Sequence, residues 1–285
     1  MGFAPRRRAV TELFMKNKAS GFKQAKAAGG IGETVRTILY AVVIAICVRT
    51  FAYEPFNIPS GSMKPTLLVG DYLFVSKFSY GYSRYSLPFG LPLIPGRIFY
   101  HPPERGDVVV FKQPANPSVD FIKRVIGLPG DKVQILKGTV YINDVPVKRT
   151  RTDAYVDSEP GTLPTILEGY NETLPNGVTH EIILRSSDPA RPVPETCTDV
   201  HEYTGDAENT CPFVVPPDHF FMMGDNRDNS ADSRVKGSGV GMVPKENLVG
   251  HAQFIFFSID DSAQWWEIWK WPFAVRYDRL FKGIR

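Results

Sequence analysis

Short apolar runs, each interrupted after a few residues by glycine or proline, fill much of the chain between residues 54 and 262. Such runs, when rich in valine, isoleucine and aromatic side chains, are typical of β-strands. They occupy 72–75, 108–111, 121–126, 133–136, 139–142 and 253–257. No apolar pattern with the 3.6-residue period of a helix persists through this region. The sequence therefore predicts a mostly β domain, with a hairpin turn at Lys137 and Gly138.

An uncharged apolar segment at 37–48 follows a leader rich in arginine and lysine. A spanning helix needs about 20 residues, and a helix over 34–53 reaches that length because Arg36 and Arg49 can extend their charged ends toward water. A signal peptide or a buried core helix is the alternative. The leader is too long for a signal peptide, and no small-residue cleavage pattern follows the segment. We expect a single retained membrane anchor, with residues 1–33 in the cytoplasm and the chain after Tyr53 exported.

The exported part divides into four segments by composition. We expect the two halves of a catalytic β core at 54–146 and 218–262. The region between them, 147–217, has few apolar clusters apart from a strand-like run at 181–184, and it is interpreted as a smaller, β-containing and irregular insertion. Residues 263–285 form a tail that contains all four tryptophans.

Two interpretations of the tail remain open. In a helix, Trp265, Trp269 and Phe273 would share one apolar stripe, which favours a core element. Tryptophan beside lysine and arginine also suits the headgroup layer of a membrane. On the second interpretation the tail contributes to a surface that docks on the lipid bilayer.

Cys197 and Cys211 lie within the predicted insertion, where an exported protein can retain a disulfide. Two free thiols are the alternative. Neither cysteine has the CxxC or paired-histidine spacing of a metal site. Asp225 and the acidic residues after it could suggest calcium, but Arg227 stands at the third position of such a loop and no glycine stands at the sixth. We therefore expect no metal and no cofactor, and the net charge of +3 gives no indication of nucleic-acid binding.

The segment 58–67 is a candidate nucleophile loop. It contains Ser60 and Ser62, and its prolines and glycine prevent a regular element. A serine nucleophile needs a base, and none of the five histidines lies in a recognisable hydrolase motif. Lysine can serve as the base where burial lowers its pKa. Lys64 is close in sequence, but in a turn before proline we expect it to be solvated and protonated.

Lys123 is the better candidate for the base. In a strand over 121–126, alternation places Lys123 on the face of Phe121 and Val125 and sends Arg124 to the opposite face. One of the two cations must then share an apolar face. A lysine at a strand edge that extends its amine into solvent is the alternative interpretation.

Four segments resemble the conserved boxes of bacterial type I signal peptidases, and they occur in the order found in that family: 58–66, 105–111, 122–131 and 224–234. The resemblance implies a serine endopeptidase of the bacterial inner membrane that removes signal peptides from preproteins after small residues, as in Ala-x-Ala. Residues 235–242 depart from the family pattern, because this link is longer and richer in glycine than is usual.

The resemblance also implies roles for individual residues. Ser62 would be the nucleophile and Lys123 the general base of a Ser/Lys dyad. Ser60 would stabilise the oxyanion together with the Ser62 N–H, and Ser230 would hold the Lys123 amine. The remaining implied residues are a supporting ion pair, Asp232 and Arg234, and the walls of shallow apolar substrate pockets, Ile58 and Val110.

Three alternatives share parts of this pattern. Self-cleaving repressors use Ser/Lys chemistry on a β core, but they carry a DNA-binding helical domain where this chain has an apolar segment. A non-catalytic binding module of the same fold would not need all four of Ser60, Ser62, Lys123 and Ser230. A mitochondrial inner-membrane relative would also have a basic leader, although the complete polar segment 224–234 favours bacteria.

Overall fold

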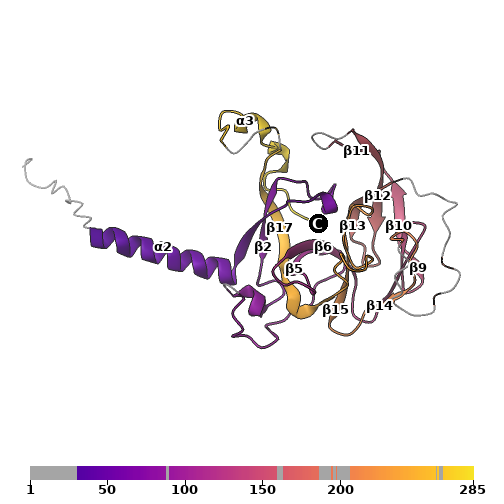
Figure 1. Ribbon diagram of the computed structural model, residues 1–285, viewed down its shortest axis with the longest axis horizontal. Coiled ribbons are helices and arrows are strands. Elements are labelled where there is room, and N and C mark those ends of the chain that lie inside the picture. Colours follow the sequence, from indigo (N-terminus) through magenta and orange to yellow (C-terminus); the bar gives the residue numbers. More distant parts are fainter. Residues whose placement is uncertain are drawn as a thin grey trace, which may run out of the picture. The chain divides into compact units, whose positions relative to one another are not determined.

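The computed structural model describes residues 31–87, 90–158, 163–185, 206–260 and 266–285, together with 194, 197 and 262. Most of the expected leader, residues 1–30, therefore lies outside the described residues. The described part contains one long helix, and its remaining regular structure is almost entirely β (Figure 1). The mostly β fold with one N-terminal apolar helix, predicted from the sequence, is confirmed.

Helix α2 (Ile31–Phe51) is 21 residues long and is apolar and long enough to cross a membrane, judged by length and composition. None of the residues in its most apolar stretch is buried, so α2 is not a core helix. It begins three residues before the predicted start at 34 and ends two residues before the predicted end at 53. The helix cannot continue further because Tyr53 already pairs with Ser76 in a sheet.

One antiparallel sheet forms the centre of the β-rich part, and Figure 1 shows several of its strands side by side. Its strands, in spatial order, are β1 (Tyr53–Asn57), β2 (Asp71–Ser76), β17 (Leu248–Ser258), β5 (Val108–Lys112), β6 (Asp120–Gly127), β15 (His219–Met223) and β16 (Met242–Pro244). Four of the predicted strands lie in β2, β5, β6 and β17. The fully buried Leu73, Val109 and Phe220 lie on this sheet, so the core lies against it.

A second sheet pairs β14 (Phe213–Val214), β7 (Lys132–Leu136), β8 (Thr139–Ile142) and β9 (Val145–Pro146), in that order. The predicted hairpin between β7 and β8 is confirmed. Lys137 and Gly138 have φ angles of 49° and 70°, and Leu136 pairs with Thr139. Positive φ at both central residues is the geometry of a two-residue turn that matches strand twist. A small pair, β3 (Tyr82–Ser83) and β4 (Arg97–Ile98), lies apart from both sheets.

The region between 147 and 217 contains more β structure than the sequence indicated. Besides β14 of the second sheet, its described strands are β10 (Lys148–Arg151), β11 (Tyr155–Asp157), β12 (Thr165–Thr173) and β13 (Thr179–Leu184). The long strand β12 pairs with β13 on one edge and with β10 and β11 on the other. Only the run at 181–184 was recognised from the sequence. The pattern of β12 is obscured because Gly169 and several polar residues interrupt its apolar positions.

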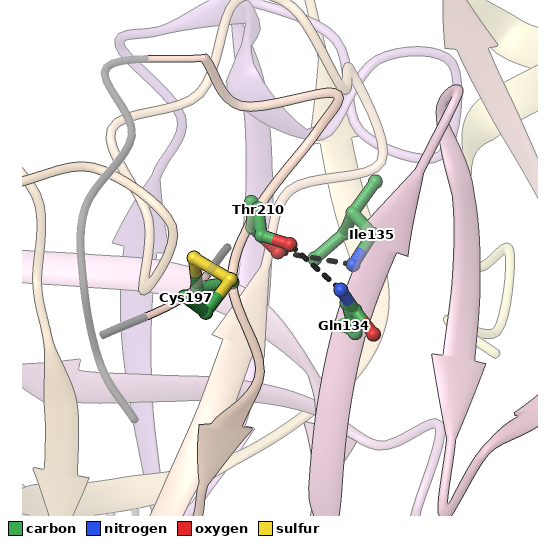
Figure 2. The surroundings of a disulfide bond; sticks show 5 residues. Gln134, Ile135, Cys197 and Thr210 are labelled. Atoms are coloured by element: carbon green, nitrogen blue, oxygen red, sulfur yellow. Dashed lines mark hydrogen bonds between the residues drawn. A yellow bond between two sulfur atoms is a disulfide. The ribbon is translucent and has the colours of Figure 1, made fainter. Parts of the chain in front are cut away.

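A disulfide bond joins Cys197 and Cys211, so the structure shows the disulfide alternative (Figure 2). Thr210, the residue before Cys211, forms hydrogen bonds with strand β7 through both its backbone N–H and its backbone carbonyl. Thr210 N donates to Ile135 O at 2.9 Å, and Thr210 O accepts from Gln134 Nε2 at 3.0 Å. The Thr210 hydroxyl also accepts from Ile135 N at 3.0 Å. The described end of the disulfide-linked segment is therefore attached to the second sheet.

The described residues of the tail do not form the helix with a buried stripe that the core-element interpretation requires. The tail's only α-helical turn in the described residues is α3 (Trp271–Ala274). Trp269 and Phe273 are 66% and 89% exposed, so the core-element interpretation is wrong for these two residues. The third residue of the stripe, Trp265, lies outside the described residues.

Candidate active site

The loop between β1 and β2 carries Ser60 and Ser62. It enters a short 3-10 helix at 61–63, and the side chain of Met63 is completely buried in the core. Asn226, which belongs to the polar segment 224–234, holds this loop in place. The Asn226 side-chain amide donates to Gly61 O, and its backbone N–H donates to Ser62 O, both at 3.1 Å. The backbone around Ser62 is therefore held by two hydrogen bonds from Asn226.

Lys123 meets Ser62 from strand β6. Its Nζ lies 2.6 Å from Ser62 Oγ and 3.0 Å from Ile122 O, and only 3% of the residue is exposed. Burial lowers the pKa of the Lys123 amine to about 8, although the carboxylates of Asp232 and Asp225 act in the opposite direction. A charged amine is disfavoured in an environment with little water. A substantial fraction of Lys123 is thus neutral near physiological pH.

The next residue, Arg124, has a different environment. Its side chain is fully buried, and its guanidinium donates to both carboxylate oxygens of Asp225, with Nε–Oδ1 at 2.8 Å and Nη2–Oδ2 at 2.6 Å. Thr66 Oγ1 donates to the same carboxylate at 2.6 Å. Burial would raise the pKa of Asp225, but Arg124 holds it below its usual range. This pair joins β6, the nucleophile loop and the polar segment.

Ser60 and Ser230 lie close to the pair of Ser62 and Lys123. The two hydroxyls of Ser60 and Ser62 are 3.5 Å apart. The Ser230 hydroxyl is buried but completes no hydrogen bond with any described group. In particular, no hydrogen bond joins it to Lys123 in the described structure.

A glycine permits this close packing. A Cβ atom placed on Gly224 would lie 2.3 Å from Ser230 Oγ and 2.5 Å from Ser62 O. Any larger residue would displace the hydroxyl or the backbone of the nucleophile. Gly224 is therefore required for Ser230 and Ser62 to approach each other.

Asp232 and Arg234 form a buried bidentate pair, with Nε–Oδ1 at 2.9 Å and Nη2–Oδ2 at 2.8 Å. Burial would raise the pKa of Asp232, but Arg234 and the Gly224 N–H hold it below its usual range. The unusual link 235–242 folds back onto this pair, since Val240 N donates to Asp232 O at 3.3 Å.

A large open groove of about 1370 Å³ passes over the nucleophile loop and Lys123. Ser60, Ser62 and Lys123 contribute to its lining. Ile58 and Val110, only 3% and 2% exposed, form apolar parts of its wall. The inserted region also reaches the groove through residues 155–158, which include strand β11.

The expectation that Lys64 is solvated is wrong. Lys64 is 6% exposed, and its amine lies 2.7 Å from Asp157 Oδ1 on β11. The sequence indicates no role for Asp157 because this residue is remote from Lys64 in sequence and lies in a region that lacks a clear strand pattern. Asp225 and Asn226 were also given no individual role, although the density of polar residues in 224–234 was a signal that could have identified them.

A serine hydroxyl in contact with a buried lysine of lowered pKa, at the base of an open groove, is the arrangement of a serine hydrolase with a lysine base. The comparisons define the class further. The family model "Signal peptidase, peptidase S26" matches residues 31–257.

Two bacterial relatives illustrate the similarity. A signal peptidase I of Rickettsia conorii is 42% identical over 258 residues, which cover 86% of this chain and 90% of the relative. A signal peptidase I of Rickettsia typhi is 42% identical over 267 residues, covering 89% and 94%. A solved signal peptidase I of Enterococcus faecalis is 24% identical and covers 53% of this chain and 97% of its own, but its TM-score of 0.28 carries no weight here.

The chain belongs to the peptidase S26 family of signal peptidases. It is accordingly a hydrolase of the serine protease class. Family membership and the apolar helix α2 together indicate a single-pass membrane protein.

Proposed function

We propose that this enzyme is an endopeptidase that removes signal peptides from exported preproteins after small residues, at sites such as Ala-x-Ala, by means of a Ser/Lys dyad. The observation that carries the proposal is the 2.6 Å approach of Lys123 Nζ to Ser62 Oγ within the groove. Both groups are in place before substrate arrives, which is the geometry that a nucleophile and its base require.

Ser62 attacks the carbonyl carbon of the scissile peptide bond, and neutral Lys123 accepts the hydroxyl proton. The resulting ammonium donates this proton to the leaving amine, which departs with the mature protein. The signal peptide then remains as an ester on Ser62. Lys123 next removes a proton from water, which hydrolyses this ester and regenerates both groups.

The oxyanion of the tetrahedral intermediate needs donors. In the proposal these are the Ser60 hydroxyl, 3.5 Å from Ser62 Oγ, and the backbone N–H of Ser62. Loss of such a donor costs roughly 3 kcal/mol of transition-state stabilisation. Ser230 would hold the Lys123 amine once substrate excludes water, and the Asp232–Arg234 pair would support Ser230 from behind.

The groove wall supports the proposed specificity for small residues. Ile58 and Val110 line the groove but are only 3% and 2% exposed, so in this proposal the apolar pockets beside the nucleophile are shallow. An alanine side chain needs little space and gains from apolar contact, whereas a larger side chain would have to displace the wall. Both walls belong to strands or loops of the central core and are held rigidly.

The proposed location is the bacterial inner membrane, with the leader in the cytoplasm and the catalytic domain outside it. The basic leader before α2 supports this orientation. The exposed aromatic side chains of the tail support contact between the catalytic domain and lipid. They are Trp266, Trp269, Trp271 and Phe273, which are between 37% and 89% exposed.

The decisive experiment compares Ser62→Ala, Lys123→Ala and the double variant in cleavage of a preprotein that ends its signal peptide with Ala-x-Ala. Each single variant should be inactive, and the double variant should be no worse, because a dyad acts as a unit. Lys148→Ala, a change of an exposed lysine on β10, is the matched control and should retain activity. Activity of Lys123→Ala above about a hundredth of the wild type would show that another group is the base.

A further inference from the structure

A second cavity, of about 710 Å³, lies where α2 ends and the first strand begins. Its lining contains two more positive than negative charges. The cations are Arg49, Lys77, Arg84 and Lys112, and the carboxylates are Glu54 and Asp120. This cavity has no part in the chemistry at Ser62, so its charge needs a separate explanation.

The excess charge is localised. Glu54 is shared by two cations, because its carboxylate lies 2.7 Å from Arg49 Nη2 and 2.8 Å from Lys77 Nζ. Lys112 has its own partner in Asp120, 2.9 Å away. Arg84 has no carboxylate within ion-pair distance among the residues described; its guanidinium lies 4.6 Å from the centre of the Tyr85 ring, and its Nη2 donates to Tyr85 Oη. One carboxylate shared by two cations, and one guanidinium without an acidic partner among the described residues, leave the cavity able to accept an anion.

Aromatic side chains lie at the end of α2, beside this cavity. Phe51, the last residue of α2, packs edge-on against Tyr82 with ring centroids 5.8 Å apart, and Tyr82 Oη donates to Phe51 O at 2.7 Å. Tyr53 packs in the same manner on Phe78, which is 48% exposed. Exposed aromatic rings at the end of a spanning helix are typical of the membrane–water interface. The cationic cavity therefore lies at the level of lipid headgroups.

We propose that this cavity binds the phosphate of an anionic lipid headgroup. Arg84 can present two N–H groups to two phosphate oxygens, and planar guanidinium is well suited to that contact. Arg49 and Lys77 add positive charge beside it while Glu54 keeps both side chains oriented. The acyl chains of the same lipid would lie along the apolar surface of α2, which a free phosphate ion could not exploit.

Binding here would also affect the groove. Phe56 and Asp120 line both the cavity and the groove, so the two sites share a wall. A lipid held in the cavity fixes the groove beside the bilayer surface, where a membrane-bound substrate emerges. This consequence rests on the proposed function, whereas binding of the headgroup does not.

The test is native mass spectrometry of the full chain, released from mixed micelles of phosphatidylcholine and phosphatidylglycerol. The wild type should retain phosphatidylglycerol in preference to phosphatidylcholine. Arg84→Gln and Arg49→Gln should each lower the retained phosphatidylglycerol about fivefold, the effect expected for one cation near an anionic surface. Arg84→Lys should lose less than Arg84→Gln because it keeps the charge.

Arg151→Gln is the matched control for Arg49→Gln. Both arginines are exposed, both have a single glutamate partner, and Arg151 does not line the cavity. Equal retention of phosphatidylglycerol by the Arg84, Arg49 and Arg151 variants would overturn the proposal. Displacement of the bound lipid by an equal concentration of soluble glycerol phosphate would also overturn it, since the site would then recognise free phosphate. The readout is binding, so it is independent of whether the chain cleaves preproteins.

Discussion

Lys64 and Asp157 form an ion pair of 2.7 Å across a sequence separation of 93 residues. Lys64 follows Ser62 by two positions, and Asp157 lies on β11 in the inserted region. The two side chains are only 8% and 18% exposed. The pair therefore connects the nucleophile loop to the opposite wall of the groove.

Breaking this pair should impair catalysis without changing the chemistry. Lys64→Met or Asp157→Asn leaves one buried charge without this partner, and we expect kcat/KM for a preprotein to fall about tenfold or more. The double variant should be less impaired than the sum of the single effects, with a coupling of about 1–3 kcal/mol. The pH midpoint of the reaction should remain unchanged, because neither residue transfers the proton. Strictly additive effects in this double-mutant cycle would show that the contact does not position the loop.

The pH dependence of the reaction should follow the titration of Lys123. Only the neutral amine accepts the Ser62 proton, and burial lowers its pKa to about 8. We therefore expect kcat/KM to rise with pH and to level off above a midpoint near this value, since kcat/KM reports the free enzyme. A bell-shaped profile centred near pH 5 would indicate carboxylate chemistry and contradict the assignment of Lys123.

The site also has a cost in stability. The pKa of Lys123 is lower in the folded chain than in the unfolded chain, so below about pH 8 folding must bury a charged amine. Lys123→Met should consequently raise the free energy of unfolding at pH 7 by about 2 kcal/mol, the size expected for a pKa shift of this kind after the lost hydrogen bond is counted. The unfolded state binds more protons between the two pKa values, so wild-type stability rises with pH there and the advantage of Lys123→Met should shrink. Chemical denaturation at pH 7 and pH 10 measures both effects, and an equal or lower stability of the variant at pH 7 would refute this account.

Local patterns were sufficient to predict the central strands. The run at 108–111 is uniformly apolar, and the run at 121–126 is apolar apart from Lys123 and Arg124; they form neighbouring strands β5 and β6. The meeting of Ser62 and Lys123 was implied by the family resemblance, since spacing alone gives no contact between residues 61 positions apart.

Other contacts could not be predicted because they depend on the tertiary structure. Asp157 reaches Lys64 only because β11 pairs with β12, and the apolar pattern of β12 is interrupted by Gly169 and polar residues. The solvation of Lys64 was wrongly predicted for the same reason. A proline-flanked turn is normally exposed, but here the inserted region covers it.

The tail offers a test of lipid contact that needs no added label. All four tryptophans of the chain lie between residues 265 and 271, so intrinsic tryptophan emission reports on this segment alone. Trp266 and Trp269 are 55% and 66% exposed, and an exposed indole ring favours the headgroup layer over water. In nanodiscs whose lipids carry bromine on the upper part of the acyl chain, the tryptophan emission of the full chain should be quenched. The double variant Trp266→Ser, Trp269→Ser should lose much of that quenching. Phe257→Leu, at a half-buried strand position outside the tail, serves as the control and should leave quenching unchanged. Equal emission in brominated and ordinary lipid would show that the tail stays in water, and lipid docking by these residues would have to be abandoned.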